Sequence, residues 1–238
     1  MIYLDAKQNI SVSKSKEYIL DSAILLAIIQ VARVIIKYIL LSQLNLTLEN
    51  VNIINIVSIM LVGVSTAFIL RGSSLFNSPS QRLTKLNNRY NNRNVRLISG
   101  AVTLICILAT FYLKSDNLLS NSLILTLCLI IQPVFEEIIF REYVWNYVRS
   151  FEKNETKVLI IVSILSAIFK LGYWDIISQN LSVIGSSYFT IDIIMPKVFW
   201  GFIVAMVLGM VKIKYKDTCL CIFGHSFINI FFRVIFNK

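Results

Sequence analysis

Long apolar runs separated by short polar segments cover nearly the whole chain. Seven of these runs reach or approach the roughly 20 residues that a helix needs to cross a bilayer. We therefore predict an all-α polytopic bundle of about seven spans, over 18–41, 51–70, 97–113, 118–149, 157–174, 193–211 and 218–236. An eighth span is expected if part of 181–195 inserts. The absence of an internal repeat or linker predicts one integral membrane domain over 1–238.

The polar segments differ in charge, which predicts their side of the membrane. The stretch 71–96 holds six basic residues and no acidic one, and Lys212, Lys214 and Lys216 form a second basic cluster. Because basic loops stay on the cytoplasmic side, we expect the loop 71–96 to be cytoplasmic. The segment 175–192 contains no Lys or Arg and is expected to be external or re-entrant. Abundant Ile, Asn and Lys are typical of AT-rich bacterial genomes, so the expected location is a bacterial plasma membrane.

Composition agrees with a membrane protein and argues against the soluble classes. The 238 residues are 56% hydrophobic and carry a formal net charge of +10, with a mean hydropathy of +0.72. Such a chain has anionic lipid headgroups as natural partners. Nucleic acid is not an expected partner, since no basic segment carries interleaved stacking aromatics.

Two adjacent acidic residues, Glu136 and Glu137, lie inside the fourth apolar run. A charged side chain at membrane depth costs at least about 3 kcal/mol, so it is seldom retained without a use. On a helix, Arg141 shares a face with Glu137 and is expected to pair with it, while Glu136 points about 100° away. The alternative is a structural role in which the three residues only tie helices together.

The fourth and fifth spans form a hairpin, so residues of the fifth span are expected to contact the carboxylates of the fourth. Glu137 and the segment 169–173 lie at similar heights above the turn that joins the two spans. Lys170, Tyr173 and Trp174 are therefore candidates to reach the Glu pair, with Lys170 expected to act as a counter-ion. In the first span, Arg33 and Lys37 share a face and are expected to turn inward or to snorkel.

The chain contains one histidine, His225, in the last span, and Asn229 lies one helical turn further on. A lone histidine on an apolar helix is usually a packed, hydrogen-bonded residue. In a protein with a buried Glu pair on another helix, however, His225 and Asn229 together are able to hydrogen-bond a carbonyl group and stabilise an oxyanion.

These residues resemble the motifs of a known family. Glu136-Glu137-x-x-x-Arg141 followed by His225-x-x-x-Asn229 is similar to the first and third motifs of the CPBP family of CAAX proteases and bacteriocin-processing enzymes, also called the Abi family. The middle motif of that family is Phe-x-x-x-His, and here Tyr173 stands in the histidine position after Phe169. The resemblance covers about 118–238.

The resemblance implies a glutamate-dependent intramembrane endopeptidase that cleaves a membrane-associated peptide or protein. In this reading Glu136 activates a water molecule, and His225 and Asn229 bind the scissile carbonyl. Some family members have been described as metalloproteases. The only ligands available here would be Glu136, Glu137 and His225, an awkward set for zinc, so no bound metal or other cofactor is expected.

Tyr173 opens a second hypothesis, because a phenol stays protonated at neutral pH and cannot share a proton as imidazole can. Loss of an acid–base partner typically lowers activity by about 10²- to 10⁴-fold. The alternative is therefore a pseudoprotease that binds a membrane protein or confers self-immunity to a bacteriocin. A proton-coupled transporter is a third hypothesis, disfavoured because no broken-helix repeat is evident.

Overall fold

The computed structural model describes residues 2–43, 47–72, 93–113, 126–185 and 189–236, and the description below concerns these residues. They form helices without a strand, as the apolar runs predict. The helical elements are α1 (Ile2–Leu41), α2 (Leu48–Gly72), α4 (Arg93–Leu113), η3 (Leu127–Ile131), α6 (Gln132–Glu137), η4 (Ile138–Val144), α7 (Trp145–Phe151), α8 (Glu155–Phe169), η5 (Lys170–Tyr173), α9 (Trp174–Ile184), α10 (Thr190–Tyr215) and α11 (Thr218–Phe236).

Within the described residues, four helical segments are long and apolar enough to cross a membrane: Glu17–Leu41, Asn50–Ile69, Glu155–Val183 and Thr190–Tyr215. Thr218–Phe232 is a shorter apolar helix. The two remaining predicted spans are also helical: α4 covers 97–113, and 126–149 is divided among η3, α6, η4 and α7. Most of the basic loop 71–96 and the first residues of the predicted span 118–149 lie outside the described residues.

Two segments outside the predicted spans are helical in the structure. In the segment 175–192, which is expected to be external or re-entrant, α9 is helical to Ile184, and 155–183 forms one long apolar helical segment. The helix ends at Gly185, whose φ of 69° is the left-handed conformation that favours glycine at a helix C-terminus. At the other end of the chain, α1 includes the polar residues that precede the first apolar run.

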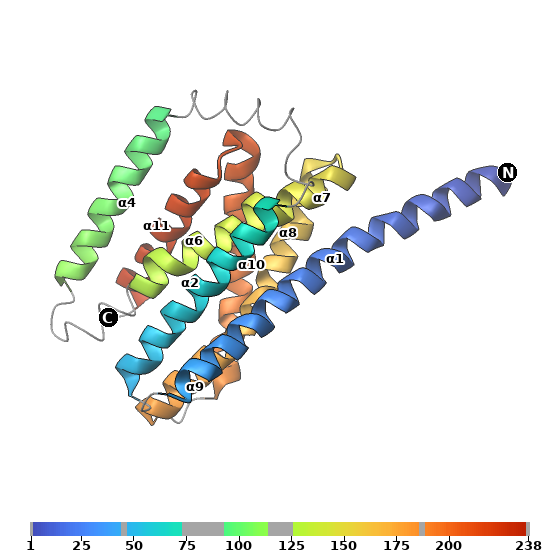
Figure 1. Ribbon diagram of the computed structural model, residues 1–238. Coiled ribbons are helices and arrows are strands. Elements are labelled where there is room, and N and C mark those ends of the chain that lie inside the picture. Colours follow the sequence, from blue (N-terminus) through green and yellow to red (C-terminus); the bar gives the residue numbers. More distant parts are fainter. Residues whose placement is uncertain (1, 44–46, 73–92, 114–125, 186–188, 237–238) are drawn as a thin grey trace.

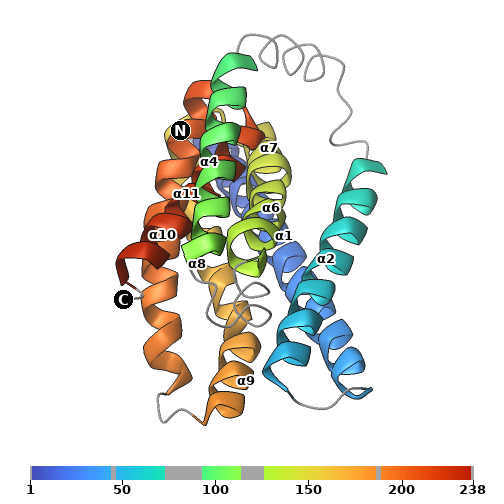
Figure 2. The same ribbon diagram turned by 90° about the vertical axis from the view of Figure 1, so that its left-hand side faces the viewer.

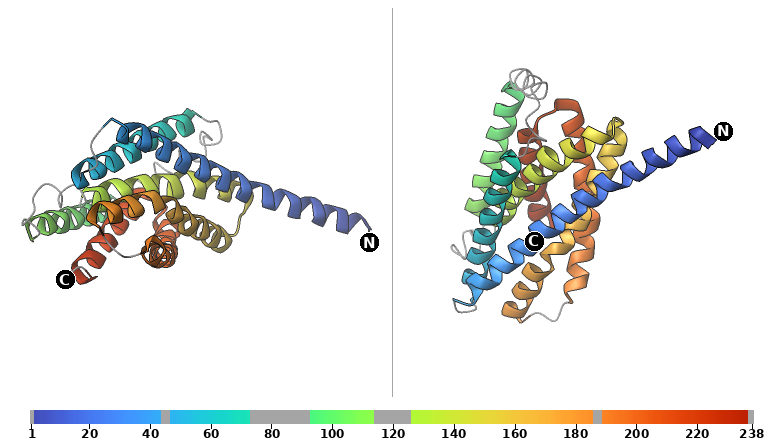
Figure 3. Two further views of the ribbon diagram at one scale, coloured as in Figure 1. Left: turned by 90° about the horizontal axis from the view of Figure 1, so that it is seen from below. Right: turned by 45° about the vertical axis from the view of Figure 1, so that its right-hand side comes forward.

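The helices pack in three main pairs around the short helix α6. α10 packs along α8, α11 along α4, and α1 along α2. α6 contacts both α2 and α11, and it therefore lies inside the bundle between the N-terminal and C-terminal helices (Figures 1 and 2). α1 crosses the bundle obliquely, and its N-terminal end extends past the other helices (Figure 3).

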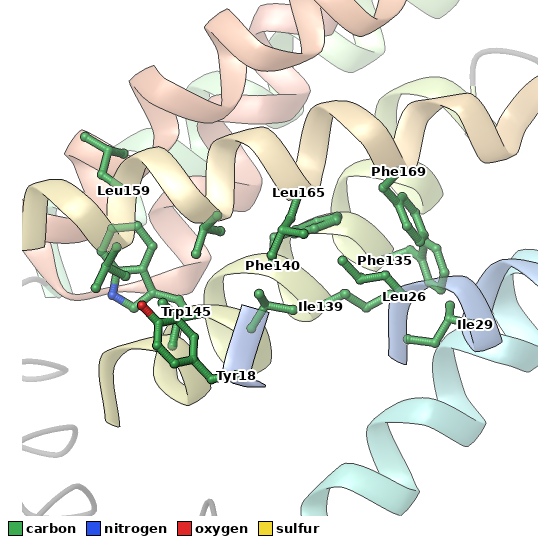
Figure 4. Packing of buried hydrophobic residues seen from close by; sticks show 14 of the residues in the cluster. Tyr18, Leu26, Ile29, Phe135, Ile139, Phe140, Trp145, Leu159, Leu165 and Phe169 are labelled. Atoms are coloured by element: carbon green, nitrogen blue, oxygen red, sulfur yellow. The ribbon is translucent and has the colours of Figure 1, made fainter. Parts of the chain in front are cut away.

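A continuous apolar core joins α1 to the segment that carries the Glu pair. Phe140 and Phe169 pack edge to face with ring centroids 5.3 Å apart, and Phe135 lies 6.2 Å from Phe169. Leu26 and Ile29 of α1 cover these rings from the other side (Figure 4). Edge-to-face pairs contribute about 0.5–1.5 kcal/mol beyond their burial. This core holds α6 and α8 in register with each other.

A buried ion network attaches α1 to the first turn of α9 and to the preceding turn η5. Arg33 donates two hydrogen bonds to Asp175, of 2.5 and 3.2 Å, and Lys37 donates one of 2.7 Å. The Arg33 and Lys37 side chains are completely buried, which confirms that they turn inward. Gly172 allows the close approach: its carbonyl accepts from Arg33 at 2.6 Å, and a Cβ there would lie 2.3 Å from Gln30.

Replacement of Asp175 by Asn should strongly destabilise the bundle, because Arg33 and Lys37 would be left as buried charges without a counter-ion. Breaking a buried ion pair in this way costs about 3–5 kcal/mol. Unfolding in mixed lipid–SDS micelles, followed by circular dichroism, measures the loss. Glu155→Gln is the control: its partner Arg149 is exposed, and an exposed pair contributes about 0–1 kcal/mol. Equal losses in the two variants would contradict the importance of the network.

Candidate active site in the membrane bundle

The Glu pair lies on a helix of irregular winding. The π-helical turns η3 and η4 flank the six-residue helix α6, and Pro133 is at its start. π-Helical turns are rare and occur often at functional sites, because the extra residue re-aims the side chains around it. Glu136 and Glu137 are 1% and 3% exposed. Both carboxylates are buried although neighbouring helical residues point about 100° apart, because α6 contacts α2 and α11 inside the bundle.

Glu136 is held by a cation and an amide. The Lys170 ammonium group forms an ion pair with Oε2 of Glu136, and the Gln132 side chain donates a 2.7 Å hydrogen bond to Oε1. The Lys170 chain runs beside Gly201 of α10, where a Cβ would lie 3.1 Å from Lys170 Cγ. The absence of a side chain at Gly201 therefore leaves room for Lys170. The contact confirms the counter-ion predicted from the residue count.

Glu137 is held by different partners. Its Oε1 lies 2.8 Å from Nδ1 of His225, and its Oε2 lies 3.3 Å from Nε of Arg141, the i+4 pair predicted from the sequence. Arg141 is fully buried and also donates a 2.9 Å hydrogen bond to the carbonyl of Ala205. Glu137 thus links α6 to η4 and α11, and it orients the imidazole ring, while Arg141 extends the contact to α10.

The second nitrogen of His225 faces the other carboxylate. Nε2 lies 4.0 Å from Oε2 of Glu136. This separation is too long for a direct hydrogen bond, but a single water molecule is able to bridge groups at such a distance. Glu136 and His225 are therefore placed to share one water molecule.

A cavity of about 540 Å³ opens in front of these groups. Glu136, Glu137, Tyr173, His225 and Asn229 all contribute to its wall. Tyr173 is 7% exposed. Its hydroxyl group interacts electrostatically with Glu136, but among the described residues none forms a well-aligned hydrogen bond with it. Residues from α2, α6, α8, η5, α9, α10 and α11 meet in this one space.

The family model for "Type II CAAX prenyl endopeptidase Rce1-like" matches residues 119–231. Over this segment, slightly less than half of the 238 residues, the chain is similar to the Rce1-like family. The match confirms the CPBP resemblance, since it includes the Glu pair, Tyr173, His225 and Asn229. It assigns the segment to a family of intramembrane endopeptidases. No curated protein and no solved structure matched the chain.

The Rce1-like segment brings together most of the residues singled out by their motifs. Arg141 differs from the others because it supports Glu137 from outside the cavity wall. Trp174, which the residue count also suggested, is 45% exposed and does not line the cavity. Sequence reasoning missed Gln132, although its spacing of four residues from Glu136 is a signal that it could have used. It also missed Asn52, which lies outside the Rce1-like segment.

The donor atoms around the Glu pair do not fit a metal centre. The carboxylate oxygens of Glu136 already contact Lys170 and Gln132, and those of Glu137 contact Arg141 and His225. Within the described part of the chain, no three His, Cys, Asp or Glu side chains are grouped so that they would hold a metal ion. We therefore derive no chemical step through a metal.

The proton on His225 is expected at Nδ1, because a carboxylate accepts the hydrogen bond there. The chain has one histidine, so ¹⁵N-histidine labelling gives one imidazole spectrum in which Nδ1 should be protonated. Glu137→Leu should remove this preference. Glu142→Leu is the control, since Glu142 binds Thr218 away from the imidazole ring. A wild-type spectrum with an unprotonated Nδ1 would contradict the assigned role of Glu137.

Proposed function

We propose that the protein is a glutamate-dependent endopeptidase that cleaves a membrane-associated peptide or protein inside the bilayer. The observation that carries this proposal is the pairing of Glu136, held in its ionised form by Lys170, with His225 Nε2 4.0 Å away across the cavity. An ionised carboxylate next to a bridging water is the arrangement that a general base needs.

The reaction is hydrolysis of a peptide bond. Glu136 takes a proton from the water molecule as its oxygen attacks the scissile carbonyl carbon. The negative charge that develops on the carbonyl oxygen is stabilised by His225 and Asn229, as in other oxyanion sites. When the C–N bond breaks, the proton held by Glu136 passes to the leaving nitrogen, and the carboxylate is restored.

Glu137 and Arg141 act in this mechanism through His225. Donation to the oxyanion requires a proton on Nε2, while Nδ1 already faces Glu137 at 2.8 Å. Glu137 therefore fixes the orientation of the ring, so that Nε2 faces Glu136. Arg141 in turn holds Glu137 in place. Lys170 keeps Glu136 ionised until the substrate and water are in position.

The tyrosine at position 173 supports a second possible function, in which the protein binds a peptide without cleaving it. The family places a histidine at this position, and here the phenol cannot exchange protons with Glu136 at neutral pH. In that case the same cavity binds a membrane peptide without cutting it, and the protein acts as a membrane-protein partner or a bacteriocin self-immunity protein. Turnover by the wild-type protein distinguishes the two functions.

Glu136→Gln should abolish cleavage, because the amide cannot take a proton from water. The assay combines a panel of prenylated CAAX-type peptides in proteoliposomes with peptide profiling of native membranes, read by mass spectrometry. Glu142→Gln, which alters a nearby glutamate outside the cavity wall, should keep wild-type turnover. If the wild type cleaves nothing while its cellular phenotype survives Glu136→Gln, the binding function replaces the protease.

Tyr173→His should raise kcat by about 10- to 100-fold if the protein is a protease that lacks its acid–base partner, in line with the usual contribution of such a group. The imidazole would enter the cavity beside Glu136. Tyr173→Phe is the matched control, and it should leave kcat within about threefold, since the hydroxyl group makes no well-aligned hydrogen bond to the described residues. No gain in Tyr173→His, together with a strong loss in Tyr173→Phe, would show that the tyrosine itself has taken over the catalytic role.

A further inference from the structure

The cavity has a second polar region, away from the Glu pair. Asn52 of α2 and Asn180 of α9 both line it. Asn52 is 1% exposed, and among the described residues neither its amide nitrogen nor its amide oxygen has a hydrogen-bond partner. The Oδ1 atom of Asn180 is likewise buried and without a partner there. Neither residue takes part in the chemistry proposed above.

Such amides are costly unless something binds them. A buried donor or acceptor without a partner costs about 1–3 kcal/mol, and the hydrocarbon region supplies no water to compensate. Most buried polar side-chain atoms in proteins are therefore paired. Because Asn52 and Asn180 face a cavity, a ligand inside it is able to supply the missing partners.

The chemistry of the two side chains indicates the kind of ligand. A primary amide offers one acceptor and two donors, which matches the N–H and C=O groups of a peptide backbone. Ile176 and Ile177 lie between Tyr173 and Asn180 in the sequence, and both also line the cavity. This region therefore combines amide groups for a backbone with apolar surface for aliphatic side chains.

We propose that Asn52 and Asn180 form a backbone-binding subsite that holds an extended segment of the substrate peptide. This inference rests on the proposed function. Asn180 follows Tyr173 by seven residues, or about 10 Å along a helix. An extended peptide spans about 3.3–3.6 Å per residue. The subsite therefore binds the backbone about three residues away from the bond that faces Glu136.

The structure offers matched control residues for both asparagines. Asn55 lies one turn after Asn52 on α2, and it is equally buried and unpartnered among the described residues, but it does not line the cavity. Gln179 is the neighbour of Asn180, and its unpartnered Oε1 also lies outside the cavity wall. Leucine is close in size to asparagine and lacks the amide group.

The test measures binding in the Glu136→Gln background, where turnover is removed. The probe is a fluorescein-labelled farnesylated peptide ending in Cys-Val-Ile-Met, titrated against the full-length protein in nanodiscs. Asn52→Leu and Asn180→Leu should each weaken binding about 10-fold, the effect of one lost hydrogen bond of about 1.4 kcal/mol. Asn55→Leu and Gln179→Leu should stay within about twofold.

Ester analogues of the probe show whether the backbone is what binds. Replacing one peptide bond at a time by an ester removes a single N–H donor. At the bond paired with Asn52, the ester should weaken binding to the Asn52 protein but cause no further loss with Asn52→Leu. Such non-additivity identifies a direct interaction.

Three results would overturn the subsite. These are no binding of the probe, equal losses in the cavity variants and their controls, and additive effects of every ester with Asn52→Leu. If Asn52→Leu fails to fold, Asn180→Leu decides by the same criteria. The proposed function is tested separately by cleavage. If Asn52 is needed for binding but the wild type cleaves nothing, the subsite is supported and the protease function is rejected. If cleavage depends on Glu136 but Asn52→Leu and Asn180→Leu bind the probe normally, the protease function is supported and the subsite is rejected.

Discussion

The side chains of two consecutive glutamates, Glu136 and Glu137, are buried inside an apolar bundle, and each carboxylate requires partners of its own. A buried charge is tolerated only where a counter-ion and hydrogen bonds replace the lost water. Glu136 receives Lys170 and Gln132, and Glu137 receives Arg141 and His225. The partners come from different helices, so the compensation of the Glu pair also brings α6, η5 and α11 together.

The surrounding structure makes these partnerships possible. Lys170 reaches Glu136 past the bare backbone at Gly201. The turn that carries Lys170 and Tyr173 is in turn held by the ion network of Arg33, Lys37 and Asp175. The Arg33 guanidinium carbon also lies 5.3 Å from the centre of the Tyr173 ring. α1, which lies outside the Rce1-like segment, therefore supports the middle motif of that segment.

Local spacing predicted the contacts that follow from helical periodicity. The i+4 relation led to the Glu137–Arg141 pair, and equal heights on a hairpin led to Lys170. Contacts between distant segments carried no comparable signal: the partner of Arg33 is 142 residues away in the chain. The π-helical turns beside α6 were also missed, because a single extra residue in a helix leaves the apolar pattern almost unchanged. The prediction that Trp174 reaches the Glu pair was wrong for a related reason, because a residue count along ideal α-helices ignores the tighter 3₁₀ turn of η5.

The charge balance around the Glu pair bears on what the cavity can bind. The two carboxylates are matched by two cations, Lys170 and Arg141. A peptide bond beside them is neutral and requires only hydrogen bonds, whereas an anionic ligand would need a further cation such as Lys197, which also lines the cavity. A proton-coupled transporter would have to separate Glu136 from Lys170 in each cycle, at the cost of exposing two charges to an apolar interior. In peptide hydrolysis Glu136 holds a proton only until the C–N bond breaks, and the carboxylate then returns to its ionised form beside Lys170. The balanced charges at the Glu pair are therefore suited to a neutral peptide bond at that point of the cavity.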